Sequence, residues 1–229
     1  MSSVIGIDGC RAGWITAKVD DKNSLIFHIV ENLNDDYLKK SYLSHIGIDI
    51  PLQLSHTGKR LAEIEARVLL KKRACTIFSP PTLNALRAKN YIDACEINFN
   101  ECGKRISKQS WNLFPKMIEA HKFLKNNSIS KFEVFEIHPE LSFMAMNDMR
   151  LIETSKKTDI GKEIRIKLIQ KFFPNFSFES VRNQYKKNQV LDDDILDSIS
   201  VLWSTQRIVD NIAQFVPKDP EKINMRIYF

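Results

Sequence analysis

The first fifty residues alternate between short apolar runs and polar turns. Residues 4–8, 15–19 and 25–30 are apolar runs separated by tight turns, which predicts three strands in an antiparallel meander. Residues 34–43 predict a short helix. A further apolar run at residues 45–50 is halted by a proline and predicts a fourth strand.

The middle of the chain carries a helical pattern instead. Apolar residues recur at helical spacing in residues 59–72, and residues 91–102 and 110–126 predict two more helices. Strand signals are almost absent between residues 51 and 126. We therefore expect a helical insertion over about residues 52–128 of one domain that spans residues 1–229, rather than a second domain.

The remaining third returns to a strand and then to helices. The run "KFEVFEIHPE" predicts a buried strand, residues 139–146 a helix, and residues 158–173 a helix capped by Thr158. Residues 174–189 are expected to be irregular, residues 192–211 an apolar helix, and "INMRIYF" a last short strand. The order predicts an α/β fold: a mixed five-stranded sheet, with a three-strand antiparallel meander plus parallel strands, flanked by helices on both faces.

Composition and charge narrow the class of protein. The chain has 229 residues and a net charge of +6, so a polyanion such as nucleic acid is a candidate partner; solvated lysines on helix faces are the alternative. The four cysteines lack the spacing of a zinc site, and no disulfide framework is expected. Without a signal peptide or an apolar run long enough for a bilayer, we predict a cytoplasmic protein with no membrane association. A homodimer stays open.

Two acids occupy the same local setting. Asp8 ends the apolar run "VIGID" and Asp49 ends the run "HIGID". An aspartate after a strand often does no more than begin a turn. If the two strands are parallel neighbours, however, both carboxylates lie in one crevice at the ends of the strands, where α/β sheets bind ligands.

The stretch "DDDILDSI" adds two acids. Asp194 and Asp197 are three residues apart and share one face of the predicted helix, and that face continues with apolar residues. Helix capping by Asp192 or Asp193 is the alternative use of this acidic cluster.

Glu136 completes the candidate set. It lies in a strand whose two faces are both largely apolar, and a buried acid there needs a partner or a metal ion. Glu140, after Pro139, ranks below it. Clustered carboxylates repel one another unless a cation neutralises them, and oxygen ligands favour Mg²⁺ or Mn²⁺. Two such ions, about 3.5–4 Å apart, are the usual arrangement for phosphodiester hydrolysis.

Several motifs, spread along nearly the whole chain, resemble a known family. They are "GIDGCRAGW", "GIDIPLQL", "EARVLLKKRACTIFSPP", "ISKQSWNLFPKMIE", "FEIHPELSF", "SKKTDIG" and "DDDILDSISVLW". The chain is similar to a bacterial and archaeal family of predicted RNase H-like nucleases. Its acid pattern resembles the Holliday-junction-resolvase branch of the ribonuclease H-like fold.

The resemblance implies roles for particular residues. Asp8, Asp49 and Asp194 or Asp197 are the implied metal ligands, and Glu136 is a further catalytic candidate. The loops Ser107-Lys108-Gln109 and Ser155-Lys156-Lys157-Thr158 are implied to contact anions, with helix capping as the alternative. The cationic residues expected to bind substrate phosphates are Arg11, Lys108, Lys156, Lys157 and Arg165.

One position departs from the family pattern. Members often carry Cys-Asp before the first helix of the insertion, whereas this chain has Ala62-Glu63. Glu63 and Glu65 are the candidates to replace that acid.

Three functions follow from the sequence as hypotheses. The first is a metal-dependent hydrolase that cleaves phosphodiester bonds in RNA or DNA through two metal ions. The second is an RNase H-like protein that binds nucleic acid or a partner without catalysis. The third is a nucleotide-binding phosphotransferase of the actin and sugar-kinase type, which shares the strand order but needs a second glycine-rich loop that this chain lacks.

Overall fold

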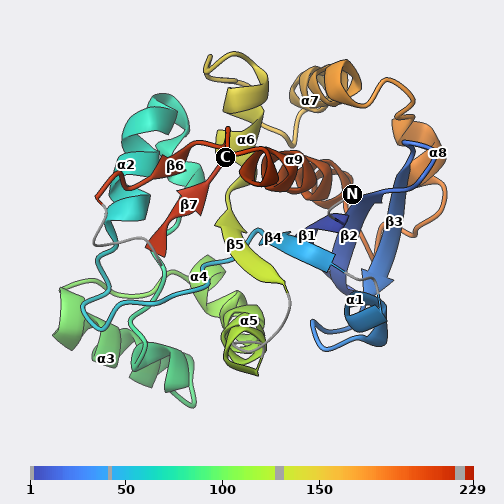
Figure 1. Ribbon diagram of the computed structural model, residues 1–229. Coiled ribbons are helices and arrows are strands. Elements are labelled where there is room, and N and C mark those ends of the chain that lie inside the picture. The colour runs from blue at the N-terminus through green and yellow to red at the C-terminus, as the bar shows by residue number, and fades with distance from the viewer. Residues whose placement is uncertain (1–2, 41–42, 127–131, 220–224) are drawn as a thin grey trace. The chain divides into compact units, whose positions relative to one another are not determined.

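The protein divides into two compact units. The computed structural model describes residues 3–40, 43–126, 132–219 and 225–229 (Figure 1). The first unit comprises residues 1–50, 128–214 and 228–229, and the second comprises residues 51–127 and 215–227. The second unit thus covers nearly the segment expected as an insertion and adds a stretch near the C-terminus; the single-domain organisation stays a prediction. Three predicted elements extend beyond the described residues: the helix at 34–43, the strand in "KFEVFEIHPE" and the strand in "INMRIYF". The parts that lie outside are residues 41–42, 131 and 223–224.

The sheet of the first unit has the predicted topology. Its strands are β1 (Ser3–Cys10), β2 (Gly13–Val19), β3 (Leu25–Val30), β4 (Leu43–Ile48) and β5 (Glu133–Ile137), in the order β3-β2-β1-β4-β5. β1 and β2, like β2 and β3, pair antiparallel, whereas β4 pairs parallel to both β1 and β5. This is the strand order of the ribonuclease H-like fold, so the predicted fold class is confirmed. The last short strand is confirmed as β7 (Ile227–Tyr228). Its Tyr228 contacts Phe135 of β5.

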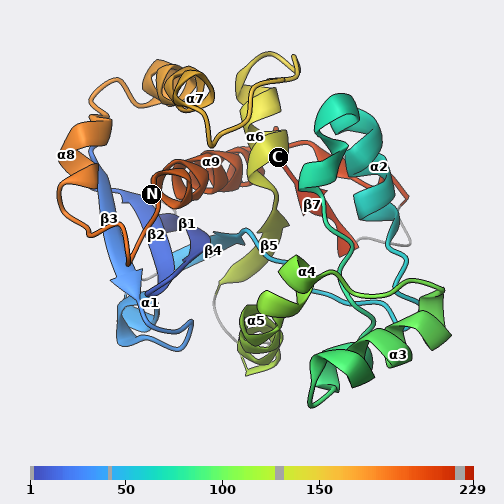
Figure 2. The same ribbon diagram turned by 180° about the vertical axis from the view of Figure 1, so that it is seen from behind.

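A long helix, α9 (Asp192–Val209), covers one face of this sheet. It packs against β1, β2, β4 and β5, and α6 (Pro139–Met146) and α7 (Asp159–Phe172) pack on it in turn (Figures 1 and 2). The short α1 (Asp36–Lys40) lies on the opposite face, where the Tyr37 ring contacts His28 of β3. Helices on both faces are therefore confirmed. Among the described residues, no helix is long and apolar enough to cross a membrane.

Two paired glycines let α9 approach the sheet closely. Gly6 of β1 and Gly47 of β4 are direct partners in the parallel ladder. A Cβ atom on Gly6 would lie 2.2 Å from the backbone nitrogen of Leu202, and one on Gly47 would lie 2.1 Å from Oγ1 of Thr205. Because only glycine lacks this atom, the two positions set the short distance between α9 and the two central strands.

The predicted segment 174–189 is not wholly irregular. It contains α8 (Phe178–Arg182), whose N-cap Ser177 accepts a hydrogen bond from the backbone N–H of Ser180. Phe178 and Val181 are buried in the main core, which stabilises a helix too short to show a clear period in sequence.

The second unit is mainly helical, as expected. Its elements are α2 (Leu61–Leu70), η1 (Lys71–Thr76), η2 (Ala85–Arg87), α3 (Tyr91–Cys102), α4 (Lys108–Asn112), α5 (Phe114–Asn126) and β6 (Phe215–Val216). The boundaries of α3 match the prediction, because Asn90 caps its first turn and Gly103, at a φ of 73°, ends it. The single helix predicted over residues 110–126 was wrong: Leu113 separates α4 from α5.

Candidate metal centre

The register of β1 and β4 places Asp8 beside Asp49. Gly6 pairs with Gly47 and Ile7 with Ile48, and the backbone N–H of Asp49 donates to the carbonyl of Ile7 at 3.0 Å. Side chains two residues apart on a strand share a face, so both acids follow the two glycines onto the face covered by α9. The two matching sequence runs are therefore neighbouring parallel strands with their acids in one crevice.

Asp197 of α9 completes a group of three carboxylates. One oxygen from each of Asp8, Asp49 and Asp197 lies within 4.8 Å of the other two. Asp8 is 7% exposed and Asp197 only 1%, whereas Asp49 is partly exposed. We call these three residues the carboxylate triad. The buried Oδ1 atom of Asp197 has no hydrogen-bond partner among the described residues.

Burial and mutual repulsion make the triad hard to ionise. Burial, followed by the charges of Asp49 and Asp197, raises the pKa of Asp8 well above its usual range. Burial and the charge of Asp197 raise the pKa of Asp49 to about 8, although Lys156 opposes this. Burial likewise raises the pKa of Asp197 to about 6, against the opposing effect of Lys156.

Lys156 is the cation that faces the triad. Its Nζ donates to Oδ2 of Asp197 and lies 3.6 Å from Oδ2 of Asp193. Burial alone would lower the pKa of Lys156, but the carboxylates of Asp197 and Asp8 outweigh it and raise the pKa. One lysine therefore partly neutralises three acids, and the site keeps an excess of carboxylates.

The comparison with known protein families places most of the chain in one family. Residues 6–222 match the sequence model of a family described as "Protein of unknown function (DUF429)". The chain belongs to the DUF429 family. Neither the curated proteins nor the solved structures gave a significant match.

The remaining acids of α9 have other partners in this DUF429 protein. Oδ2 of Asp194 accepts the backbone N–H of Leu191 at 2.8 Å, so Asp194 caps the helix, a role the sequence offered to Asp192 or Asp193. Its charge still raises the pKa of Asp8. Asp192 instead lies 3.2 Å from both Lys162 and Arg182; burial would raise its pKa, but these two hydrogen bonds outweigh burial and lower it.

Glu136 is buried but stands apart from the triad. It pairs with Ile48 in the register of β4 and β5, and strand alternation therefore directs it to the face opposite Gly47 and Asp49. Its charge raises the pKa of Asp49, although less than that of Asp197 does. Its predicted catalytic role remains a prediction.

Glu140 and Arg165 form a matched pair within the core. Oε2 of Glu140 lies 2.8 Å from an Nη atom of Arg165, and both residues are buried. The same guanidinium donates to the carbonyl oxygens of Gly161 and Thr154. Arg165, expected to bind a substrate phosphate, is 0% exposed and is engaged by the fold instead.

The other predicted cations differ in their exposure. Arg11 lies exposed in the turn between β1 and β2, and Lys157 is exposed next to Lys156. Lys108, in the second unit, rests over the ring of Tyr91 at 3.6 Å. In the two loops that the resemblance singled out, Ser107 caps α4 and Thr158 caps α7, as the capping alternative expects.

The acid at the departure from the family pattern also has a partner. Glu63 is buried in the second unit, and its Oε1 lies 3.3 Å from Nε of Arg60. Glu65 is partly exposed on the same helix.

Sequence reasoning missed two features of the site. One is the pair of glycines that precede the acids in "GID", although their repetition in both strands was visible. The other is the contact of Lys156 with Asp197, which joins residues 41 positions apart in the chain.

Proposed function

We propose that this DUF429 protein is a divalent-metal-dependent hydrolase of phosphodiester bonds in nucleic acid, acting through two metal ions. The carboxylate triad of Asp8, Asp49 and Asp197, within 4.8 Å on the helix-covered face of an RNase H-like sheet, carries the proposal. The proposal also adopts the resemblance to the predicted RNase H-like nucleases. Because one fold serves many chemistries, the residues of the site carry the argument for activity.

The donor set fits Mg²⁺ or Mn²⁺. All three ligand groups are carboxylates. Among the described residues around the triad, one lysine, Lys156, opposes their negative charge. The buried Oδ1 of Asp197, without a hydrogen-bond donor among the described residues, is an atom that a cation would satisfy. When bound, such ions activate a water nucleophile and stabilise the leaving oxygen of the phosphodiester.

The chain's own residues divide the remaining work. Asp8 on β1, Asp49 after β4 and Asp197 on α9 would be the ligands that hold the ions. Lys156 holds Asp197 through its ammonium group. Arg11 and Lys157 are exposed cations of the same unit and are proposed to contact the nucleic-acid backbone.

A cleavage assay tests the proposal. Labelled RNA, DNA, RNA–DNA hybrid and a four-way junction are incubated with Mg²⁺ or Mn²⁺, and with EDTA as the metal-free arm. We expect cleavage of at least one substrate, lost by about 10³-fold or more in Asp8→Asn and Asp197→Asn, because each removes a ligand charge from the reacting site. Asp21→Asn, at an exposed turn, is the matched control and should retain activity. Cleavage that survives both triad substitutions would overturn the proposal.

The Lys156–Asp197 contact favours one alternative, a nucleic-acid-binding protein without catalysis. In that function Lys156 is the permanent counter-ion of the triad, and no metal ion is needed. Salt-sensitive binding of nucleic acid, unchanged by EDTA and without turnover, would support it. Lys156→Met distinguishes the two functions. It leaves the three metal ligands of the hydrolase intact, so metal-dependent cleavage should persist. It removes the cation of the metal-free alternative, so nucleic-acid binding by that protein should weaken.

A further inference from the structure

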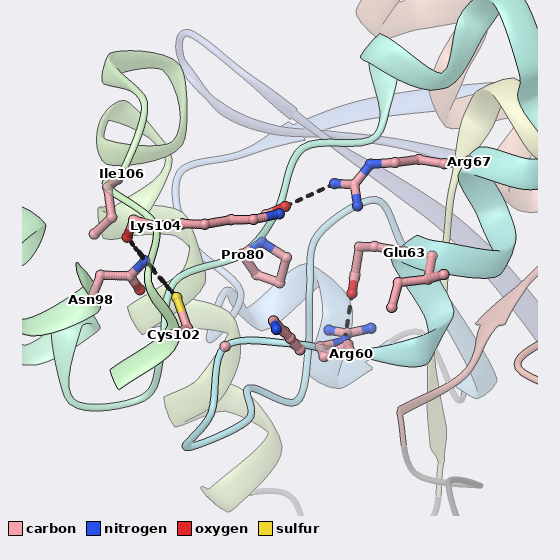
Figure 3. A pocket seen from close by; sticks show the side chains of 12 residues that line it. Arg60, Glu63, Arg67, Pro80, Asn98, Cys102, Lys104 and Ile106 are labelled. Atoms are coloured by element: carbon pink, nitrogen blue, oxygen red, sulfur yellow. Dashed lines mark hydrogen bonds and ion pairs between the residues drawn. The ribbon is translucent and has the colours of Figure 1, made fainter. Parts of the chain in front are cut away.

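The second unit contains a cavity that its cationic side chains dominate. The cavity has a volume of about 220 Å³ and is lined by Lys59, Arg60, Arg67 and Lys104 together with one acid, Glu63 (Figure 3). Four cationic groups against one carboxyl group give the lining an excess of three positive charges. None of these residues belongs to the carboxylate triad, and all lie in the second unit.

Hydrogen bonds to backbone carbonyls and neighbouring side chains hold Arg60 and Arg67 at the cavity wall. The Arg60 side chain is 0% exposed; it donates to the carbonyl of Gln53 at 2.8 Å and contacts Glu63 at 3.3 Å. Arg67 donates twice to the carbonyl of Ile77, at 3.1 and 2.9 Å, and once to Oγ of Ser79 at 2.9 Å. Guanidinium groups that are already ordered lose little conformational freedom when they bind an anion.

The two lysines have no such partners. No hydrogen bond or ion pair joins the ammonium group of Lys59 or of Lys104 to any other described residue. In Figure 3 the Lys104 side chain extends across the cavity toward Arg67. Its backbone is held by Asn98, whose amide donates to the Lys104 carbonyl at 2.7 Å. The cavity therefore presents cations that no described acid neutralises.

The remaining walls define the rest of the ligand. Ile64, Pro80 and Ile106 contribute apolar surface, and Asn98 contributes a polar side chain. A volume of about 220 Å³ lies below the range of about 300–1,000 Å³ that is common for drug-sized ligands. These walls suit a small molecule that combines strong negative charge with a short carbon skeleton.

We propose that this cavity binds a small phosphomonoester. A phosphomonoester carries a charge of about −1.5 to −2 at pH 7, which matches an excess of three cations better than a singly charged carboxylate or phosphodiester does. The phosphate oxygens accept from the ordered guanidinium of Arg67 and from Lys59 and Lys104, and the carbon part contacts the apolar wall. The proposal does not depend on hydrolysis at the triad.

Calorimetric titration with ribose 5-phosphate, in a buffer with EDTA, tests this site. We expect saturable binding, no binding of ribose, and weaker binding of inorganic phosphate, which lacks the carbon part. The double variant Lys59→Met/Lys104→Met should weaken binding at least tenfold, and Lys89→Met, at an exposed position outside the cavity, should not. Both variants alter exposed side chains, and equal melting temperatures will show that the fold is kept.

Three outcomes would overturn the proposal. The first is no saturation up to about 10 mM ligand, since a Kd near 1 mM is already weak binding. The others are equal affinity in the double variant and the Lys89 variant, and inorganic phosphate that binds as tightly as the ester. Asp8→Asn removes a proposed metal ligand and should leave ribose 5-phosphate binding unchanged. The two proposals therefore fail separately: cleavage depends on Asp8, and phosphomonoester binding depends on the lysines.

Discussion

Glu140 and the carboxylate triad, which both lie in the first unit, differ in their balance of charge. Glu140 faces one arginine, and the Arg165 guanidinium also donates to two carbonyl groups, so the charges of this pair balance. Asp8, Asp49 and Asp197 share one lysine, and the pKa values of all three are raised. The first arrangement holds the protein together. The second leaves an acid excess that a cation would relieve, and this difference separates a structural ion pair from a binding site.

Breaking the matched pair should have the largest effect on stability. Arg165→Met leaves Glu140 as a buried charge without its cation, and we expect a loss of about 3–5 kcal/mol in the free energy of unfolding, measured by urea denaturation. Lys167→Met on the same helix removes an exposed lysine and should change stability by less than about 0.5 kcal/mol. If Arg165→Met were as stable as Lys167→Met, the pair would not be structural.

Adding a divalent ion should affect only the unmatched group. Mn²⁺ at about 100 times its dissociation constant should stabilise the wild type by about 2.7 kcal/mol, seen as a rise in melting temperature. Asp197→Asn should abolish the rise, because it removes a triad ligand, whereas Asp21→Asn should keep it. An equal rise in Asp197→Asn would show that Mn²⁺ binds elsewhere.

The two glycines beneath α9 test how the triad is assembled. Gly6→Ala forces a methyl group against the backbone of Ser198 and Leu202, and we expect a loss of about 1–3 kcal/mol by urea denaturation, together with weaker Mn²⁺ binding. In Gly47→Ala the three atoms nearest the new methyl group belong to the side chains of Thr205, Ile137 and Val201 rather than to the backbone, so we expect a smaller loss. A larger loss for Gly47→Ala than for Gly6→Ala would contradict this order.

The candidate site shows which of its features can be predicted from patterns in the sequence. Asp8 and Asp49 could be paired in advance because their strands repeat the same motif, and strand ends gather ligands. The helix period placed Asp194 and Asp197 on one face, but it could not separate the capping acid from the triad acid, because both lie in the first two turns. That choice depends on the N-cap geometry at Leu191.

The cationic residues were harder to assign. A lysine or arginine in sequence carries the same charge whether it faces solvent, a substrate or a buried acid. Arg165 pairs in the core with Glu140, 25 residues earlier, and the partly exposed Lys156 pairs with Asp197, 41 residues later. Such long-range pairs leave no local period, so neither partner could be chosen before the fold was known.

The last effect we predict has an unusual sign. Asp49→Asn should stabilise the metal-free protein, and by more at pH 8 than at pH 5. The pKa of Asp49 is raised to about 8 in the folded state, so this state holds a proton that the unfolded chain releases near pH 4. Stability therefore falls as the pH rises from about 4 to 8, and asparagine, which stays neutral, removes this loss. Urea denaturation of both proteins across this pH range measures the difference.

Asp192→Asn is the control of opposite sign. The pKa of Asp192 is lowered by Lys162 and Arg182, so its contribution is already complete above about pH 4 and disappears only in more acidic solution. Asp192→Asn should thus lower stability by the same amount at pH 5 and pH 8. A destabilising Asp49→Asn, or an effect that does not change between these two pH values, would show that Asp49 is balanced by its surroundings as Glu140 is, and the contrast between the two groups of acids would be lost.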